Sequence, residues 1–184
     1  MNQSSFLQEY KTEVKVWDEM YSTEGVRNHY SQFFSNLENI DIHDLSTKND
    51  LARKLFMRQG ITFTVYDNGE GIEKIFPFDI IPRIIEAGEW KKLEAGLKQR
   101  LKALNIFLKD IYNEQFILKD KVVPYNLIHT CPYFLPEMKN VRIPFDIYTH
   151  IAGIDLIRDH DGEFYVLEDN LRTPSGVSYM LENR

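Results

Sequence analysis

The sequence predicts an α+β protein in which N-terminal helices and one long helix accompany mixed or antiparallel strands. Apolar residues recur every three or four positions over much of the first sixty residues and again over residues 90–111, a spacing typical of helices. Two other stretches are rich in β-branched and aromatic residues, and each surrounds a turn sequence. We therefore expect a helical segment, an α/β region and a final hairpin region: residues 1–60, 61–147 and 148–184.

The amino-acid composition and charge of the chain exclude several classes of protein. The 184 residues include 28 acidic and 22 basic side chains, a net charge of −6, and 43% are hydrophobic. The chain lacks the long basic runs of a nucleic-acid or membrane-surface protein and any stretch of about 18 apolar residues. Its first ten residues lack the apolar core of a signal peptide, and Cys131 is the single cysteine. We expect a cytoplasmic protein that binds neither nucleic acid nor membrane.

Three helices are expected in the N-terminal segment. The first two are marked by residues at helical spacing: Phe6, Tyr10, Val14, Trp17 and Tyr21, and then Tyr30, Phe33 or Phe34, and Leu37. The third begins near Asn49, as its N-cap, and ends at Gly60, because glycine adopts a positive φ at low cost.

The middle region should contain a hairpin and a long helix. Residues 61–66 alternate in the manner of a strand, and the turn sequence 67–71 separates them from a second strand at 72–76. Leucines at helical spacing predict a helix over about 88–112. Residues 120–144 contain four prolines, and we expect a loop-rich crossing with short strands there.

A second hairpin carries the candidate chemistry. Two β-branched runs surround the turn sequence Asp159-His160-Asp161-Gly162. A tip at His160 and Asp161 pairs Arg158 with Glu163, Asp155 with Val166, and Gly153 with Glu168. Asp155 and Glu168 then share a face as diagonal neighbours, about 7 Å apart. A tip one residue longer changes the register and brings Asp155 over Asp169 instead.

This face would suit a hard cation. Asp155, Glu168 and Asn170 together offer two carboxylates and an amide, and Mg²⁺ prefers such oxygen ligands. Arg172 would add a fixed positive charge. The alternative, which the pattern leaves open, is that these carboxylates are ordinary strand-end charges paired with Arg158 or Arg172. An EF-hand is excluded because its first ligand position would be an isoleucine and both flanks read as strands.

The segment from Ile154-Asp155 through Asp161-Gly162 to Glu168-Asp169-Asn170 resembles the metal-binding hairpin of ATP-grasp ligases. The wider sequence resembles the bacterial circularly permuted type 2 ATP-grasp proteins. The motifs that carry this likeness are Gly60-Ile61-Thr62-Phe63-Thr64-Val65-Tyr66, Ile75-Phe76-Pro77-Phe78-Asp79-Ile80-Ile81-Pro82-Arg83, Leu97-Lys98-Gln99-Arg100, Gly153-Ile154-Asp155-Leu156 and Leu167-Glu168-Asp169-Asn170-Leu171-Arg172-Thr173-Pro174-Ser175-Gly176.

The resemblance implies an ATP-dependent ligase. In that family Asp155, Glu168 and Asn170 would hold Mg²⁺, and Arg172 would be the catalytic contact to phosphate or acyl-phosphate. ATP is the co-substrate, and a carboxylate and an amine, from small molecules or peptides, are the substrates. Many ATP-grasp ligases have an arginine two residues before the aspartate, but this chain has Gly153 there.

The family's members are longer than this chain, and permutation places the nucleotide clamp after the hairpin. We therefore expect an N-terminal fragment, an incomplete circularly permuted ATP-grasp fold that is inactive alone and completed by a missing C-terminal part. The alternative function is a non-catalytic binding or interaction module that lacks the nucleotide clamp.

Overall fold

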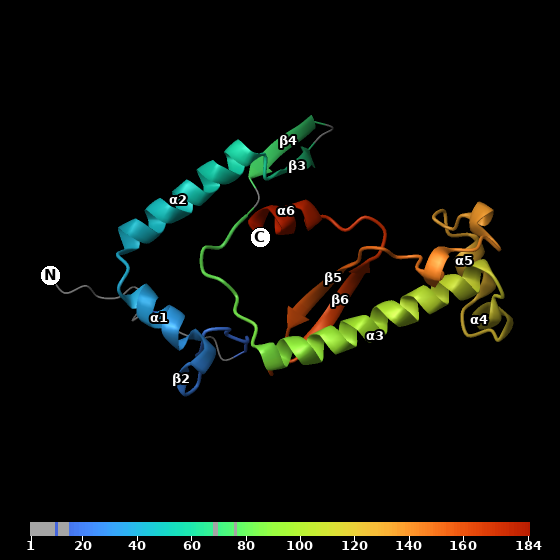
Figure 1. The fold of residues 1–184 in the computed structure, drawn as a ribbon, viewed down its shortest axis with the longest axis horizontal. Helices are drawn as coiled ribbons and strands as arrows, with labels where there is room; N and C mark the ends of the chain where they lie inside the picture. Colours follow the sequence, from blue (N-terminus) through green and yellow to red (C-terminus); the bar gives the residue numbers. More distant parts are fainter. Residues whose placement is uncertain (1–9, 11–14, 68–69, 76) are drawn as a thin grey trace. The chain divides into compact units, whose positions relative to one another are not determined.

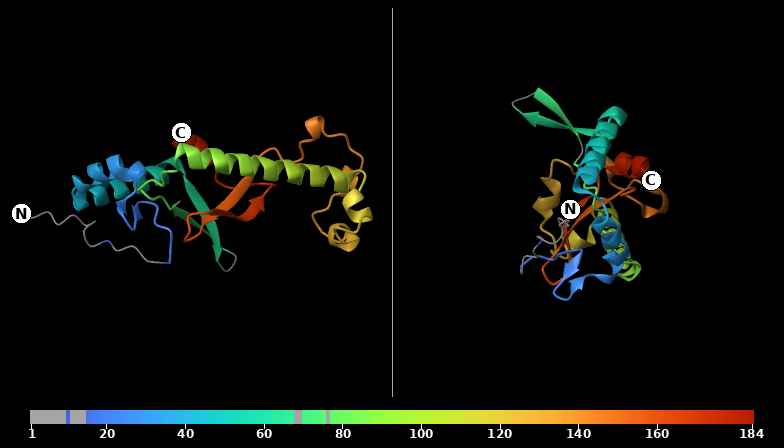
Figure 2. Two further views of the ribbon diagram at one scale, coloured as in Figure 1. Left: turned by 90° about the horizontal axis from the view of Figure 1, so that it is seen from below. Right: turned by 90° about the vertical axis from the view of Figure 1, so that its left-hand side faces the viewer.

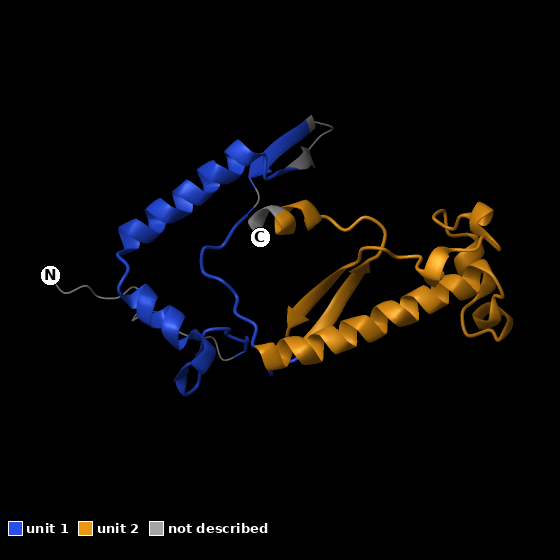
Figure 3. Ribbon diagram, viewed as in Figure 1, with its two compact units in different colours: residues 1–86, 159–163, 183 blue, residues 87–158, 164–182, 184 orange. Residues whose placement is uncertain are grey.

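The computed structural model describes residue 10 and residues 15–67, 70–75 and 77–184, apart from the side chains of residues 64–70, 182 and 183. The chain consists of two compact units (Figure 3): residues 1–86, 159–163 and 183, and residues 87–158, 164–182 and 184. Helices and two-stranded antiparallel sheets occur together, so the α+β class is confirmed. No helix within these described ranges is long and apolar enough to cross a membrane.

The described residues of the first unit form two hairpins and two α-helices (Figure 1). The outer residues of β3 and β4 pair as Thr62 with Ile75 and Asp67 with Glu70, so the hairpin expected over residues 61–76 is confirmed. The elements are β1 (Tyr21–Ser22), β2 (Gly25–Val26), the 3₁₀ helix η2 (Asn28–Tyr30), α1 (Ser31–Glu38), α2 (Ile42–Gln59), β3 (Thr62–Asp67) and β4 (Glu70–Ile75).

The helix expected from Phe6 to Tyr21 is wrong from residue 15 onward, where the chain forms turns and β1. The Asp18 carboxylate accepts hydrogen bonds from two backbone N–H groups, the nearer being that of Tyr21 at 2.7 Å. Such a side-chain acceptor favours a turn over a helix. Phe6 and Val14 lie outside the described residues.

The other two N-terminal helices are present, with one boundary changed. α2 begins after Asp41, whose carboxylate caps the N–H of His43 at 2.7 Å, and not near Asn49. It ends as expected at Gly60, which has φ 69° and ψ 24°. The N–H of Ile61 then reaches back to the Phe56 carbonyl at 2.9 Å, so the last turn is closed.

Tyr30 connects α1 with the segment that leaves the second hairpin. Its side chain is 1% exposed. The hydroxyl donates to the Pro82 carbonyl at 3.0 Å and accepts from the Ile84 N–H at 2.8 Å. The buried phenol thus satisfies both of its hydrogen-bonding roles while its ring fills the unit's interior.

The second unit is built along α3 (Ala87–Tyr112), which matches the long helix expected over residues 88–112. Figures 1 and 2 show α3 running alongside the hairpin of β5 and β6. Residues 120–144 form helical turns and no strand, since proline lacks the N–H that a strand ladder needs. The remaining elements are α4 (Phe116–Lys119), α5 (Tyr125–His129), η3 (Pro136–Met138), η4 (Pro144–Asp146), β5 (Gly153–Arg158), β6 (Phe164–Asn170) and α6 (Val177–Asn183).

The hairpin of β5 and β6 is present, but its predicted register is wrong. The turn is longer than expected. The N–H of Gly162 donates a hydrogen bond to the Asp159 carbonyl, and Gly162 itself adopts a left-handed conformation with φ 86°. One residue of β6, Leu167, is a β-bulge without a partner on β5. The observed pairs are Arg158 with Phe164, Ile157 with Tyr165, Leu156 with Val166, Asp155 with Glu168, Ile154 with Asp169, and Gly153 with Asn170.

Asp159 and His160 form a hydrogen-bonded pair in the hairpin turn. The Asp159 carboxylate lies 2.7 Å from Nδ1 of His160 and also accepts the His160 backbone N–H at 2.6 Å. The hydrogen bond that His160 donates to this carboxylate, together with the carboxylate's charge, raises the pKa of His160 above 6.5, with a smaller contribution from Asp161. The same hydrogen bonds lower the pKa of Asp159.

Replacing glycine by alanine should have opposite effects at two positions. Gly60→Ala should destabilise the protein by about 1–2 kcal/mol, because a Cβ is strained at positive φ even with open space around it. Gly96→Ala, inside α3 and also in open space, should stabilise it by about 0.5–1 kcal/mol. Urea denaturation measures both, and equal shifts would contradict the left-handed conformation of Gly60.

Asp159→Asn should lower the pKa of His160 toward 6.5, because it removes the charge while keeping an acceptor oxygen. The pair contributes its full stability only between the ordinary pKa values of its two groups, 3.8 for Asp159 and 6.5 for His160. Because the folded-state pKa of His160 is raised, this contribution is lost as the pH rises through that pKa. The stability difference between wild type and variant should close over the same range. NMR titration of the His160 ring tests this, and an unchanged midpoint would contradict the pair.

Candidate functional site

The two faces of the β5–β6 hairpin have different characters, because paired residues on antiparallel strands point to the same side. On the inner face, the face toward α3, lie Ile154, Leu156, Arg158, Phe164, Val166 and Asp169. On the outer face, the opposite one, lie Gly153, Asp155, Ile157, Tyr165, Glu168 and Asn170.

The outer face brings together the three predicted metal ligands. Asp155 and Glu168 are direct cross-strand partners, and both are exposed. Asn170 lies two residues beyond Glu168 on the same face and donates its side-chain N–H to Glu168 Oε1 at 2.8 Å. This hydrogen bond fixes the amide so that its carbonyl oxygen remains available beside the carboxylates.

Asp169, between two of these residues in sequence, points the other way. Its carboxylate accepts two hydrogen bonds from the Arg100 guanidinium of α3, at 2.7 Å to Nε and 2.6 Å to Nη2. The Asp169 side chain is only 16% exposed. The paired guanidinium lowers the pKa of Asp169 and keeps it a carboxylate.

Other residues of α3 hold β5 from both ends. Near the hairpin turn, Arg158 is 6% exposed, pairs with Glu89 in the first turn of α3 and lies over the Phe164 ring. Before β5 begins, the Asn105 side-chain oxygen accepts the backbone N–H groups of Tyr148 and Thr149, at 2.8 and 3.0 Å. The helix thus acts as a straight support along the whole hairpin.

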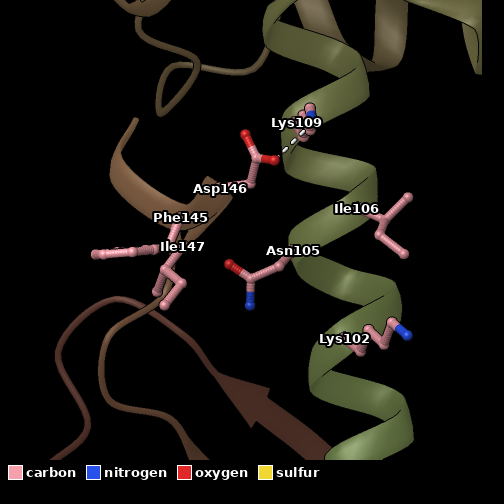
Figure 4. Close-up of a pocket in the computed structure, with 7 residues that line it drawn as sticks. All are labelled: Lys102, Asn105, Ile106, Lys109, Phe145, Asp146 and Ile147. Atoms are coloured by element: carbon pink, nitrogen blue, oxygen red, sulfur yellow. Dashed lines mark hydrogen bonds and ion pairs between the residues drawn. The ribbon is translucent and has the colours of Figure 1, made fainter. Parts of the chain in front are cut away.

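A surface pocket lies beside this support (Figure 4). It has a volume of about 320 Å³ and lies between α3 and the segment around η4, where Lys109 pairs with Asp146 at 2.7 Å. Asn105 is fully engaged with backbone groups, so the pocket's polar lining serves mainly to join helix and loop. It is lined by Lys102, Asn105, Ile106, Lys109, Phe145, Asp146 and Ile147.

Arg172 follows β6 and is exposed. Its guanidinium carbon lies 5.7 Å from the centre of the Tyr133 ring, a cation–π contact. Within the described residues it forms no ion pair with Asp155 or Glu168, so those carboxylates and this cation do not neutralise one another.

Gly153 has a steric role that sequence reasoning missed. A Cβ at this position would lie 2.8 Å from the Cβ of Pro174 and 3.7 Å from that of Asn170. The chain after β6 therefore folds back over Gly153, and any larger residue would push Pro174 away.

The donor set on the outer face fits a hard divalent cation. Two carboxylates and an amide are oxygen ligands of the kind that Mg²⁺ takes, and their exposure leaves positions for water or phosphate. In the described part of the chain, no three His, Cys, Asp or Glu side chains cluster closely enough to hold a metal. The Asn170 amide is therefore needed to complete the set.

Known proteins resemble this chain over most of its length. An uncharacterized protein of Mycobacterium tuberculosis (strain H37Rv) is 46% identical over 170 residues, which is 92% of this chain and 30% of that protein. An uncharacterized protein of Synechocystis sp. is 50% identical over 140 residues, which is 76% of this chain and 29% of that protein. The chain spans less than a third of the length of these relatives.

A further relative carries a functional name. The "Putative glutamate–cysteine ligase 2-3" of Frankia alni is 38% identical over 174 residues, 91% of this chain and 19% of that protein. Residues 82–184, which include α3 and the β5–β6 hairpin, match the model of the family described as circularly permuted ATP-grasp type 2. This match covers more than half of the sequence, so the chain belongs to the circularly permuted ATP-grasp type 2 family.

Proposed function

We propose that this chain is the N-terminal part of an ATP-dependent ligase that joins a carboxylate to an amine or a similar nucleophile. The observation that carries the proposal is the direct pairing of Asp155 with Glu168, with Asn170 hydrogen-bonded beside them on the exposed face. Family membership supports ATP as the co-substrate. The name of the Frankia alni relative supports ligase chemistry in general, but the chain covers 19% of that protein and its substrates are not transferred.

In this proposal Asp155, Glu168 and Asn170 would hold Mg²⁺, which would supply positive charge that stabilises phosphoryl transfer. The hairpin's own contribution is positional. The cross-strand pair sets the spacing of the two carboxylates, and the hydrogen bond from Asn170 fixes the rotamer of Glu168. Preorganised ligands need no rearrangement when the substrate arrives.

The proposed reaction has two balanced steps. An oxygen of the substrate carboxylate forms a bond to the γ-phosphorus of ATP, the bond to ADP breaks, and an acyl-phosphate results. The amine then attacks the acyl carbon, inorganic phosphate leaves, and the amine loses a proton to form the amide. Arg172 would contact the transferred phosphate, and its exposed guanidinium leaves donors for that purpose.

Glu168→Gln should lower kcat of the full-length ligase by at least about 100-fold, because it removes a ligand charge from a site that stabilises phosphoryl transfer. The side chains are nearly isosteric, so the fold should be kept. Asp161→Asn, which removes a carboxylate from the turn of the same hairpin, is the matched control and should leave turnover unchanged. The assay follows ADP release across panels of carboxylates and amines. Equal turnover in both variants would exclude the metal role.

Arg172→Ala should also slow turnover, but added Mg²⁺ should restore less of its activity than that of Glu168→Gln, because the arginine is proposed to contact phosphate rather than the metal. The measurement is kcat against Mg²⁺ concentration for both variants, at matched stability. A stronger rescue of Arg172→Ala would contradict its role. If no ADP is released with any substrate pair, the protein is instead a non-catalytic binding module.

A further inference from the structure

Glu168 and Asp169 are neighbouring carboxylates with different partners. On the inner face, the position opposite Ile154 is occupied by Asp169, which is bound to Arg100 of α3 through two hydrogen bonds. On the outer face, the position opposite Asp155 is occupied by Glu168. This assignment depends on the unpaired residue Leu167, which shifts the register of everything that follows it in β6.

A regular strand would exchange the two carboxylates. Continuing the pairing of Arg158 with Phe164 without a bulge places Leu167 opposite Asp155 and Glu168 opposite Ile154. Glu168 would then lie on the inner face, where Arg100 would meet it in place of Asp169. Two registers thus compete, and they differ in which carboxylate the guanidinium binds.

We propose that Arg100 is a positioning residue that fixes the bulged register of β6 by binding Asp169, and thereby keeps Glu168 and Asn170 beside Asp155. This inference rests on the proposed function for the role of that face. A bidentate arginine–carboxylate pair is geometrically specific, and Asp169 meets it with both oxygens.

The support that carries Arg100 is fixed by contacts that do not involve the residues of β6 after Leu167. Glu89 holds Arg158 at one end of β5, and Asn105 holds the backbone before the other end. From residue 89 to residue 100 the helix rises about 16 Å. From Arg158 to Ile154 β5 advances about 14 Å. The two distances are similar, so the Arg100 guanidinium lies beside the position opposite Ile154. The residue of β6 at that position must therefore provide the carboxylate that binds it.

If Asp169 and Glu168 compete for Arg100, the variants should differ in how much Mn²⁺ affinity they lose. An ion pair that only stabilised the fold would not produce this difference. Asp169→Asn leaves Arg100 available to bind Glu168, so this variant should favour the regular register. Mn²⁺ binding should weaken about tenfold, which corresponds to about a tenth of the molecules in the bulged register. Arg100→Met breaks the same ion pair but removes the attraction for Glu168, so it should weaken binding by about threefold or less. The double variant should resemble Arg100→Met.

The test measures Mn²⁺ affinity of the intact protein by electron paramagnetic resonance, together with cross-strand NOEs. Asp169→Asn should replace the contact between residues 155 and 168 with one between residues 155 and 167. Lys98→Met, which removes a cation from the exposed Lys98–Glu94 pair on the same helix, is the matched control and should change neither readout.

The outcomes separate this inference from the proposed function. If Glu168→Gln weakens Mn²⁺ binding but Asp169→Asn leaves affinity and NOEs unchanged, Arg100 does not set the register and the inference is wrong. Equal losses in Asp169→Asn, Arg100→Met and the double variant would also overturn it. If Glu168→Gln leaves Mn²⁺ binding unchanged, the proposed metal site fails, while the NOEs still decide the register.

Discussion

Adjacent residues of a β-strand point to opposite faces, and the candidate site depends on this constraint. The sequence Glu168-Asp169-Asn170 cannot present all of its polar groups to one side. Leu167, the extra residue in β6, decides that Glu168 and Asn170 share a face with Asp155 while Asp169 turns toward α3. Leu167, an apolar residue that binds no ligand itself, therefore determines that Glu168 and not Asp169 faces Asp155.

The long helix gives the hairpin a fixed reference. A two-stranded hairpin has little stability of its own in water. Here α3 contacts it through charged or polar groups at separate points along its length, from Glu89 through Arg100 to Asn105. Apolar residues of the inner face, among them Leu156 and Val166, complete the support. Asp155 and Glu168 on the outer face can consequently remain exposed, because the packing that supports the hairpin is on its other face.

The sequence was informative where local patterns decide the structure. The long helix, the glycine end of α2 and both longer hairpins follow from periodicity and turn residues. The register of the second hairpin did not, because the left-handed Gly162 lengthens the turn and the bulge at Leu167 shifts the pairing by one more residue, which returns Glu168 to the face of Asp155. The bulge has no local signature, since the residue that binds Asp169, Arg100 of α3, lies 69 residues away in sequence. The first expected helix failed because a capping carboxylate, Asp18, competes with helical periodicity.

The packing of Pro174 over Gly153 makes the two positions interdependent. The resemblance to ATP-grasp ligases led us to expect an arginine at position 153, where this chain has glycine. In this hairpin the new side chain would meet a proline ring, and the displaced strand exit also carries Arg172. An arginine at position 153 would therefore be introduced at the expense of moving Arg172, so the hairpin and the segment that follows it can change only together.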